Sequence, residues 1–249
     1  MPVLLERVAH VPAPPPGYGG TTPADLHEHA LDLEVLYGPH KDLDWLELGE
    51  RVSYADLAEA AAGQLGEDSG VDMVVTVTPV PDCQARLLPG ALLAVRLGGM
   101  PLVLGVNDQG AAGPFTALRL AATHLTSGQV RRAAVVLMEQ STHPPEASYT
   151  PPPRAGAVVL VLGTESGRPV DGLSIRRIPP AERRPVPRAG YLQPWYELAR
   201  RHAEQPETEL AVADRDDGLG YDCRVRFTAA GAAHAADRLV PALTLEARP

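Results

Sequence analysis

Four segments of this chain are almost continuously apolar, and they constrain the fold more than any other feature. They are Val71–Thr78, Pro101–Val106, Ala133–Glu139 and Gly156–Leu162. A strand with one face in water alternates apolar and polar residues, so an unbroken apolar run indicates burial on both faces. Helical patterns separate the runs, at Ser53–Leu65, Gly90–Leu97 and Gly110–Ser127. This order predicts an α/β fold with helices on both faces of a mixed, mostly parallel sheet.

Further elements are expected before and after this central region. Strands are predicted at Leu4–Val11 and Leu173–Ile178, and a helix from Thr22 to Tyr37 with Pro23 in its first turn. Loops are predicted at Pro79–Leu88 and Pro144–Pro153. The later part predicts a helix, a hairpin and a last helix, at Gln193–Glu204, Glu209–Ala213 with Tyr221–Phe227, and Ala229–Leu239. We therefore expect a domain over 1–178, a Pro- and Arg-rich linker over 179–190 and a C-terminal extension over 191–249.

Composition excludes several classes of protein. With 249 residues, 45% of them apolar, the chain can bury a core without disulfides or metal. The net charge of −9, with Lys41 as the sole lysine, argues against nucleic acid, which is bound by clustered Lys and Arg. The two cysteines form no CxxC motif, so no metal and no cofactor are expected. Without a signal peptide or a long apolar run, the sequence predicts a cytoplasmic protein that does not enter a membrane.

Residues 70–165 carry short motifs in a defined order. A strand ending at Thr78-Pro79 precedes a helix from Pro89 to Leu97-Gly98. After the next strand, Gly110-Ala111-Ala112-Gly113 leads into Phe115-Thr116-Ala117-Leu118, and the following helix ends at Thr126-Ser127-Gly128. Ala133–Glu139 and the segment from Ala155-Gly156 to Leu160 complete the series. In this order and spacing, the chain resembles ketoacyl-ACP synthase III, a family of thiolase-fold condensing enzymes.

The resemblance implies a thiolase-like fold, although the sequence matches only a single αβαβα half with a short α+β extension. In this family a second half supplies a His and an Asn that assist decarboxylation and stabilise the developing negative charge. No His-Gln-Ala motif or Asn in a Gly-rich segment follows Ile178. His202 and His234 lack that context, so we expect no normal condensation by this chain alone.

The resemblance also locates the family's nucleophile. A Cys at the start of the buried helix takes the acyl group there, and the helix dipole favours its thiolate. Counting back from Ala117-Leu118 places this position at Ala111, which offers no nucleophile. A two-residue slip would place Gln109 there, as in the inactive chain-length-factor partners of some polyketide synthases. By resemblance, Asp108, Gln109, Ala111 and Gly113 form the substrate-binding part of the site.

Other side chains are candidates for a different nucleophile. Cys83 lies in a predicted loop, and Ser141 lies two residues before His143, so a hydroxyl and an imidazole are neighbours. The alternative readings are that Cys83 is a small packed residue and that Ser141 and His143 are not aligned as nucleophile and base. Cys223, in the predicted hairpin, is expected to be packed inside.

Two surfaces suggest partners. By resemblance, Cys83, Arg86, Leu87 and Leu88 belong to a dimer interface. The basic pairs at Arg131, Arg176 and Arg183 suit an acidic acyl carrier protein or a CoA phosphate, although a solvated end of an element is the favoured explanation of each pair. Trp195 and its neighbours suggest an apolar anchor that packs on the sheet or docks a partner.

Three hypotheses follow. The leading one is a degenerate ketoacyl synthase III-like protein, a non-catalytic or pocket-shaping subunit in polyketide or fatty-acyl biosynthesis. It would form a homodimer, or a heterodimer with a full-length condensing enzyme, because an uncovered sheet face must be buried. The second is an acyltransferase or thioesterase with a non-standard nucleophile. The third is a stand-alone protein that binds an acyl ligand.

Overall fold

The computed structural model describes residues 1–15, 23–37, 49–66, 69–83, 88–143, 149–184, 188–205 and 207–229. Its main sheet has eight strands in the order β3-β2-β4-β6-β1-β7-β10-β9. These strands are β1 Leu4–Pro12, β2 Met73–Thr78, β3 Leu102–Asn107, β4 Ala133–Glu139, β6 Gly156–Gly163, β7 Arg168–Arg177, β9 Leu210–Asp216 and β10 Tyr221–Phe227. The helices are α1 Pro23–Tyr37, α2 Tyr54–Leu65, α3 Pro89–Leu97, α4 Ala112–Thr126 and α5 Gln193–Glu204.

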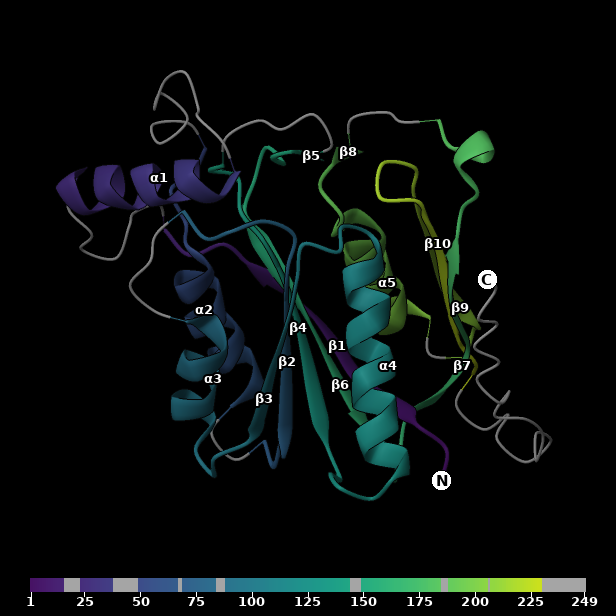
Figure 1. The fold of residues 1–249 in the computed structure, drawn as a ribbon. Helices are drawn as coiled ribbons and strands as arrows, with labels where there is room; N and C mark the ends of the chain where they lie inside the picture. The colour runs from purple at the N-terminus through teal and green to yellow at the C-terminus, as the bar shows by residue number, and fades with distance from the viewer. Residues whose placement is uncertain are drawn as a thin grey trace.

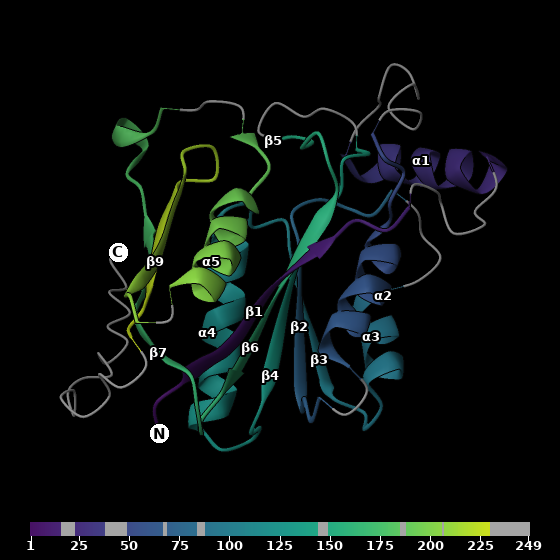
Figure 2. The ribbon, with the colours of Figure 1, turned by 180° about the vertical axis from the view of Figure 1, so that it is seen from behind.

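The elements form four layers, which Figures 1 and 2 show edge-on. Helices α2 and α3 cover one face of the central strands, and α4 and α5 cover the other. The sheet then turns at β7, so that β10 and β9 lie on the far side of α4 and α5. Apolar residues of β9 and β10, such as Val212 and Val225, therefore share one core with α4 and with the central strands.

The four apolar runs are strands β2, β3, β4 and β6, as the sequence predicted, and the sheet is mixed. The prediction that it is mostly parallel is wrong. Strand β2 is parallel to β3 and to β4, whereas every other pairing of this sheet in the described residues is antiparallel. Strands β4 and β6 are buried along their whole length because helices cover both faces. The expectation of burial on both faces is wrong for β3, an edge strand whose residues are mostly exposed or half-buried. A continuous apolar run therefore does not by itself establish burial on both faces, and it leaves strand direction open.

Several element bounds differ from those predicted. The strand expected at Leu173–Ile178 begins earlier, at Arg168, because its first residues pair with β1 and β10. The first hairpin strand extends beyond Ala213 to Asp216 through its pairing with β10. Short strands β5 (Tyr149–Thr150) and β8 (Arg188–Ala189) pair with each other inside segments predicted as a loop and a linker, and a 3₁₀ turn spans Pro180–Glu182. The helix predicted over 229–239 lies outside the described residues after 229.

Helix α2 begins where the sequence predicted. The Ser53 hydroxyl accepts the backbone N–H of Asp56, and the Asp56 carboxylate accepts the backbone N–H of Ser53. This reciprocal pair satisfies two groups that have no partner within the helix. Among the described helices, none combines the length and apolar character needed to cross a membrane.

Residues before α5 connect it to the central strands. Tyr191 is fully buried, and its hydroxyl donates to the Met138 carbonyl oxygen at 2.9 Å, with the Val77 carbonyl oxygen at 3.1 Å. The Glu139 carboxylate accepts the backbone N–H of Tyr191 at 2.7 Å. Gly190 has a φ of +70°, and a Cβ there would lie 2.8 Å from Glu139. The turn into α5 is therefore built around a buried carboxylate.

Helix α5 contacts α4 through aromatic rings. Trp195 and Phe115 are both fully buried, and their ring centroids are 5.2 Å apart in an edge-to-face arrangement. Trp195 thus packs inside the molecule, which is one of the two roles that the sequence suggested for it. Tyr196 follows it and makes an edge-to-face contact with His10 of β1.

We expect Trp195→Ala to lower the free energy of unfolding by about 3–5 kcal/mol, because it removes a large side chain from the core that α5 shares with α4 and the central strands. Urea unfolding followed by circular dichroism measures this change. Val35→Ala on the exposed face of α1 is the control, and it should change stability by less than about 0.5 kcal/mol. An equally small effect of Trp195→Ala would show that α5 folds apart from the central sheet.

Candidate functional site

The start of α4 is the position to which the sequence assigned the family's nucleophile. Ala111 is the N-cap residue of this helix and is fully buried. The turn between β9 and β10 lies over it, and the Asp216 carboxylate accepts the Ala111 backbone N–H at 3.3 Å. A Cβ on Gly110 would lie 2.3 Å from the same carboxylate and 2.9 Å from the Leu219 side chain. The helix start is therefore closed by the chain itself.

This closure has an electrostatic consequence. The first backbone N–H groups of a helix lack intrahelical partners, and the helix dipole places partial positive charge there. In an acyl-transferring site, such a helix end favours a thiolate. Here the Asp216 carboxylate takes that place, and its other oxygen accepts the Leu219 backbone N–H at 2.9 Å. No thiol or hydroxyl occurs from Asp108 to Phe115.

The four residues predicted to bind substrate lie in different surroundings. The side-chain oxygen of Gln109, before the helix, accepts the Thr116 hydroxyl at 2.7 Å. Gly113 is buried, and a Cβ there would lie 2.9 Å from Val77, so its small size allows α4 to approach β2. Ala111 lies under the turn described above. Asp108 has a φ of +55° and lines an open cavity beside β3.

That cavity has a volume of about 620 Å³ and lies where β2 and β3 end and α3 begins. Because parallel strands end at the same edge, the residues after β2 and after β3 meet there. The lining residues are Tyr54, Thr76, Thr78, Val80, Pro81, Asp82, Leu88, Pro89, Gly90, Ala91, Val103, Gly105, Asn107 and Asp108. Burial raises the pKa of Asp108 above its ordinary value. The cavity has the size and the mainly apolar lining of small-molecule sites.

Cys83 lies near this cavity but is almost fully buried. Its backbone N–H donates to the Gln140 side chain at 3.1 Å, and its thiol lies 4.0 Å from the Val52 carbonyl oxygen. Burial raises its pKa well above the usual value, and the neighbouring Asp82 charge raises it further. These surroundings favour a packed thiol over a reactive one. Of the other predicted interface residues, Leu88 is exposed, whereas Arg86 and Leu87 lie outside the described residues.

Ser141 and Thr142 fix the segment before α2. The Ser141 hydroxyl accepts the Glu50 backbone N–H, and the Thr142 hydroxyl accepts that of Arg51, each at 2.9 Å. Both residues and His143 are buried. Ser141 therefore has a structural role in the fold. That its hydroxyl acts as a nucleophile stays a prediction.

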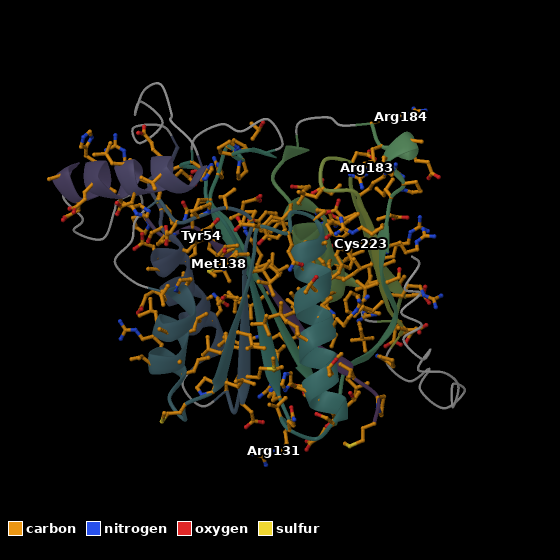
Figure 3. The ribbon with its side chains drawn as sticks, in the orientation of Figure 1. Tyr54, Arg131, Met138, Arg183, Arg184 and Cys223 are labelled. Atoms are coloured by element: carbon orange, nitrogen blue, oxygen red, sulfur yellow. The ribbon has the colours of Figure 1, made fainter. Side chains whose placement is uncertain are left out.

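The basic pairs do not form one patch. Figure 3 shows Arg131 at the opposite end of the molecule from Arg183 and Arg184. Arg176 pairs with Asp222 at 2.5 Å, and Arg177 lies over the Tyr221 ring. Binding of an acyl carrier protein or a CoA phosphate stays a prediction. No group of three or more potential metal ligands occurs in the described part of the chain.

Asp216 and Leu219 were not among the residues predicted for the site. They belong to an acidic turn, Asp214 to Gly220, that the sequence marked only as part of a hairpin. Nothing local in that turn indicates that it reaches the start of α4, because the two segments are about a hundred residues apart.

No family model matches the sequence, and no curated protein matches it significantly. Solved structures do match the fold. They include ChlB3, named as an acyltransferase, with a TM-score of 0.62 and 15% identity over 92% of this chain and 98% of that one. OleA of Xanthomonas campestris gives a TM-score of 0.59 at 12% identity, over 91% and 98%. The 3-oxoacyl-(acyl carrier protein) synthase III of Xanthomonas oryzae gives 0.58 at 12%, over 91% and 99%.

The chain therefore has the fold of the thiolase-like condensing enzymes, as the sequence motifs indicated. Each alignment extends over nearly the whole matched chain. The similarity thus extends beyond residues 70–165. That the chain is a single half of the thiolase-like fold stays a prediction. The packing of α5, β9 and β10 against α4 is consistent with this longer match.

We expect both cysteines to react slowly with iodoacetamide in the folded chain near neutral pH. Burial raises the pKa of Cys83, and burial with nearby aspartates raises that of Cys223 to about 12, so little thiolate is present. Mass spectrometry of timed samples measures the labelling. In guanidinium, both should react at the rate of a free thiol. Rapid labelling of Cys83 in the folded chain would instead favour the acyltransferase alternative.

Proposed function

We propose that the chain is a non-catalytic, ketoacyl synthase III-like subunit that assembles with a condensing enzyme in polyketide or fatty-acyl biosynthesis. The observation that carries this proposal is the closed start of α4, where Asp216 accepts the Ala111 N–H. Acyl transfer needs an open position at which a nucleophile meets the thioester. A buried alanine beneath a carboxylate supplies neither the nucleophile nor the space.

The edge of the sheet at β3 supports a partner-binding role. Strand β3 is the last strand at this edge, so one side of its backbone is left without a strand partner in the described sheet. Four apolar side chains in and around β3 are exposed: Leu88 at the start of α3, Val95 on α3, Met100 in the turn before β3 and Leu102 at the start of β3. An open strand edge beside apolar residues is a site for pairing with another chain. The partner that we propose is a second copy of this chain or a full-length condensing enzyme.

Light scattering tests the assembly. The mass is measured for the chain alone and after co-expression with a full-length condensing enzyme, taken from beside the gene where one is encoded there. We expect a dimer or a mixed complex, and we expect Val95→Asp with Leu102→Asp to reduce it to monomers, because charges at the edge oppose pairing. Leu31→Asp, at an exposed apolar position on α1, is the control and should leave assembly intact. A chain that stays monomeric and forms no complex with the enzyme would overturn the subunit proposal.

Mass spectrometry tests the absence of acyl transfer. We expect no covalent adduct when the chain is incubated with acyl-CoA thioesters, and none for Ala111→Cys, because the new thiol would lie beneath Asp216 and Leu219. Circular dichroism confirms that the variant folds. An acyl adduct on Ala111→Cys would show that this position is open, and an adduct on the unaltered chain would overturn the non-catalytic role.

A further inference from the structure

A second cavity, of about 400 Å³, lies beside the last turn of α2 and the start of β4, at the end of the molecule where Figure 3 labels Arg131. Strand β1 contributes to it from inside the sheet, so this cavity is separate from the open edge at β3. Its described lining contains two guanidinium groups and no carboxylate. The lining residues are Arg7, Leu65, Gly66, Ser69, Val71, Arg132 and Val161. The cavity therefore presents positive charge in a chain whose net charge is −9.

Arg7 is the lining residue with an unsatisfied charged donor. The pairing register of β1 with β6 shifts between Leu5 and Arg7, and irregularities of this kind redirect a side chain. The Arg7 Nη2 donates to the Gln64 carbonyl oxygen in the last turn of α2. Its Nε is buried without a hydrogen-bond partner, and no carboxylate pairs with Arg7 in the described part of the chain. Because buried donors are almost always paired, this side chain indicates a place for an acceptor.

Ser69 supplies a second unsatisfied group in the same cavity. Its hydroxyl oxygen is buried and has no hydrogen-bond partner within the described residues. Its backbone is fixed, because Arg132 Nη1 donates to the Ser69 carbonyl oxygen and the Ser69 N–H donates to the Gly66 carbonyl oxygen at 3.2 Å. The Glu6 carboxylate accepts Arg132 Nε at 2.8 Å and compensates its charge. The excess positive charge of the site is therefore that of Arg7.

We propose that this cavity binds the phosphate group of a small phosphate monoester. The Arg7 guanidinium would supply the charge and the planar donors that match a phosphate, and the Ser69 hydroxyl would donate a further hydrogen bond. The apolar side chains of Leu65, Val71 and Val161 would cover the organic part of the ligand. The volume is within the range of small-molecule sites and exceeds what a bare phosphate fills. This inference uses no residue of the β3 edge and does not depend on the proposed role as a subunit.

Three probes separate recognition of the phosphate from apolar contact. Phenyl phosphate, inorganic phosphate and phenol are titrated into the full chain by calorimetry, near neutral pH and at low salt. We expect phenyl phosphate to bind about tenfold more tightly than phenol, the effect of charge-assisted hydrogen bonds, and more tightly than inorganic phosphate, because its ring covers the apolar walls. Inorganic phosphate binding as tightly as phenyl phosphate would overturn the monoester. Equal binding of phenyl phosphate and phenol, or no binding of either phosphate, would overturn the site.

Variants locate the binding. Arg7→Gln should weaken phenyl phosphate binding about tenfold and leave phenol unchanged, whereas Arg7→Lys, which keeps the charge, should lose less. Ser69→Asp places a carboxylate of the chain in the cavity with Arg7, so it should fold and should abolish binding of both phosphates. Arg131→Gln removes an equal charge from an exposed side chain at the same end of the molecule, and it should change the affinity by less than about twofold. Unchanged affinity of Arg7→Gln, with its fold confirmed by circular dichroism, would exclude this site.

A further variant tests competition from neighbouring acidic residues. Glu67 and Asp68 come between Gly66 and Ser69 in the sequence and lie outside the described residues. We expect the unaltered chain to bind phenyl phosphate, and Glu67→Gln with Asp68→Asn to bind it about two- to threefold more tightly, because two like charges are removed. Binding by this double variant alone would show that the chain's own carboxylates take the place of the phosphate, and it would overturn the proposal.

Discussion

The packing of α4 between the central strands, α5 and β10 is the constraint on which the rest of this structure depends. Helices are usually covered on one side, but α4 has the central strands on one side, α5 beside it and β10 beyond it. Phe115 can be fully buried only because Trp195 covers it from α5. Residues after position 190 are therefore part of the core that stabilises the central sheet, and the turn at Gly190 with its buried Glu139 sets where they dock.

The same packing determines the chemistry at the start of α4. Because β9 and β10 lie over this helix, the turn between them reaches its N-terminus, and an acidic residue there satisfies a backbone N–H that has no partner within the helix. The chain thus combines a fold shared with condensing enzymes with a helix start that Asp216 closes, at the position to which the sequence assigned the nucleophile. A fold can persist while the site within it changes, because the packing of apolar residues and the chemistry of a few polar ones are separate requirements.

The open features of the molecule gather at the other side, near β3. The open edge of β3 runs between two exposed apolar sites, with Leu88 and the cavity at its carboxyl end and Met100 and Leu102 at its start. In sheets with parallel strands, ligands bind beyond the carboxyl ends of the strands, and Asp82 and Asp108 lie beyond two such ends. The edge of β3 is consequently the place where an assembly partner has accessible surface.

The sequence by itself determined the strands of the main sheet, the described helices, the α2 capping box and the lack of a thiol or hydroxyl from Asp108 to Phe115, because these depend on local pattern and residue identity. The tertiary structure alone decided the short strands β5 and β8, the direction of β1 and β6, and the reach of the Asp216 turn onto α4. A continuous apolar run carries no record of strand direction, and contacts between segments about a hundred residues apart arise from packing rather than from local preference.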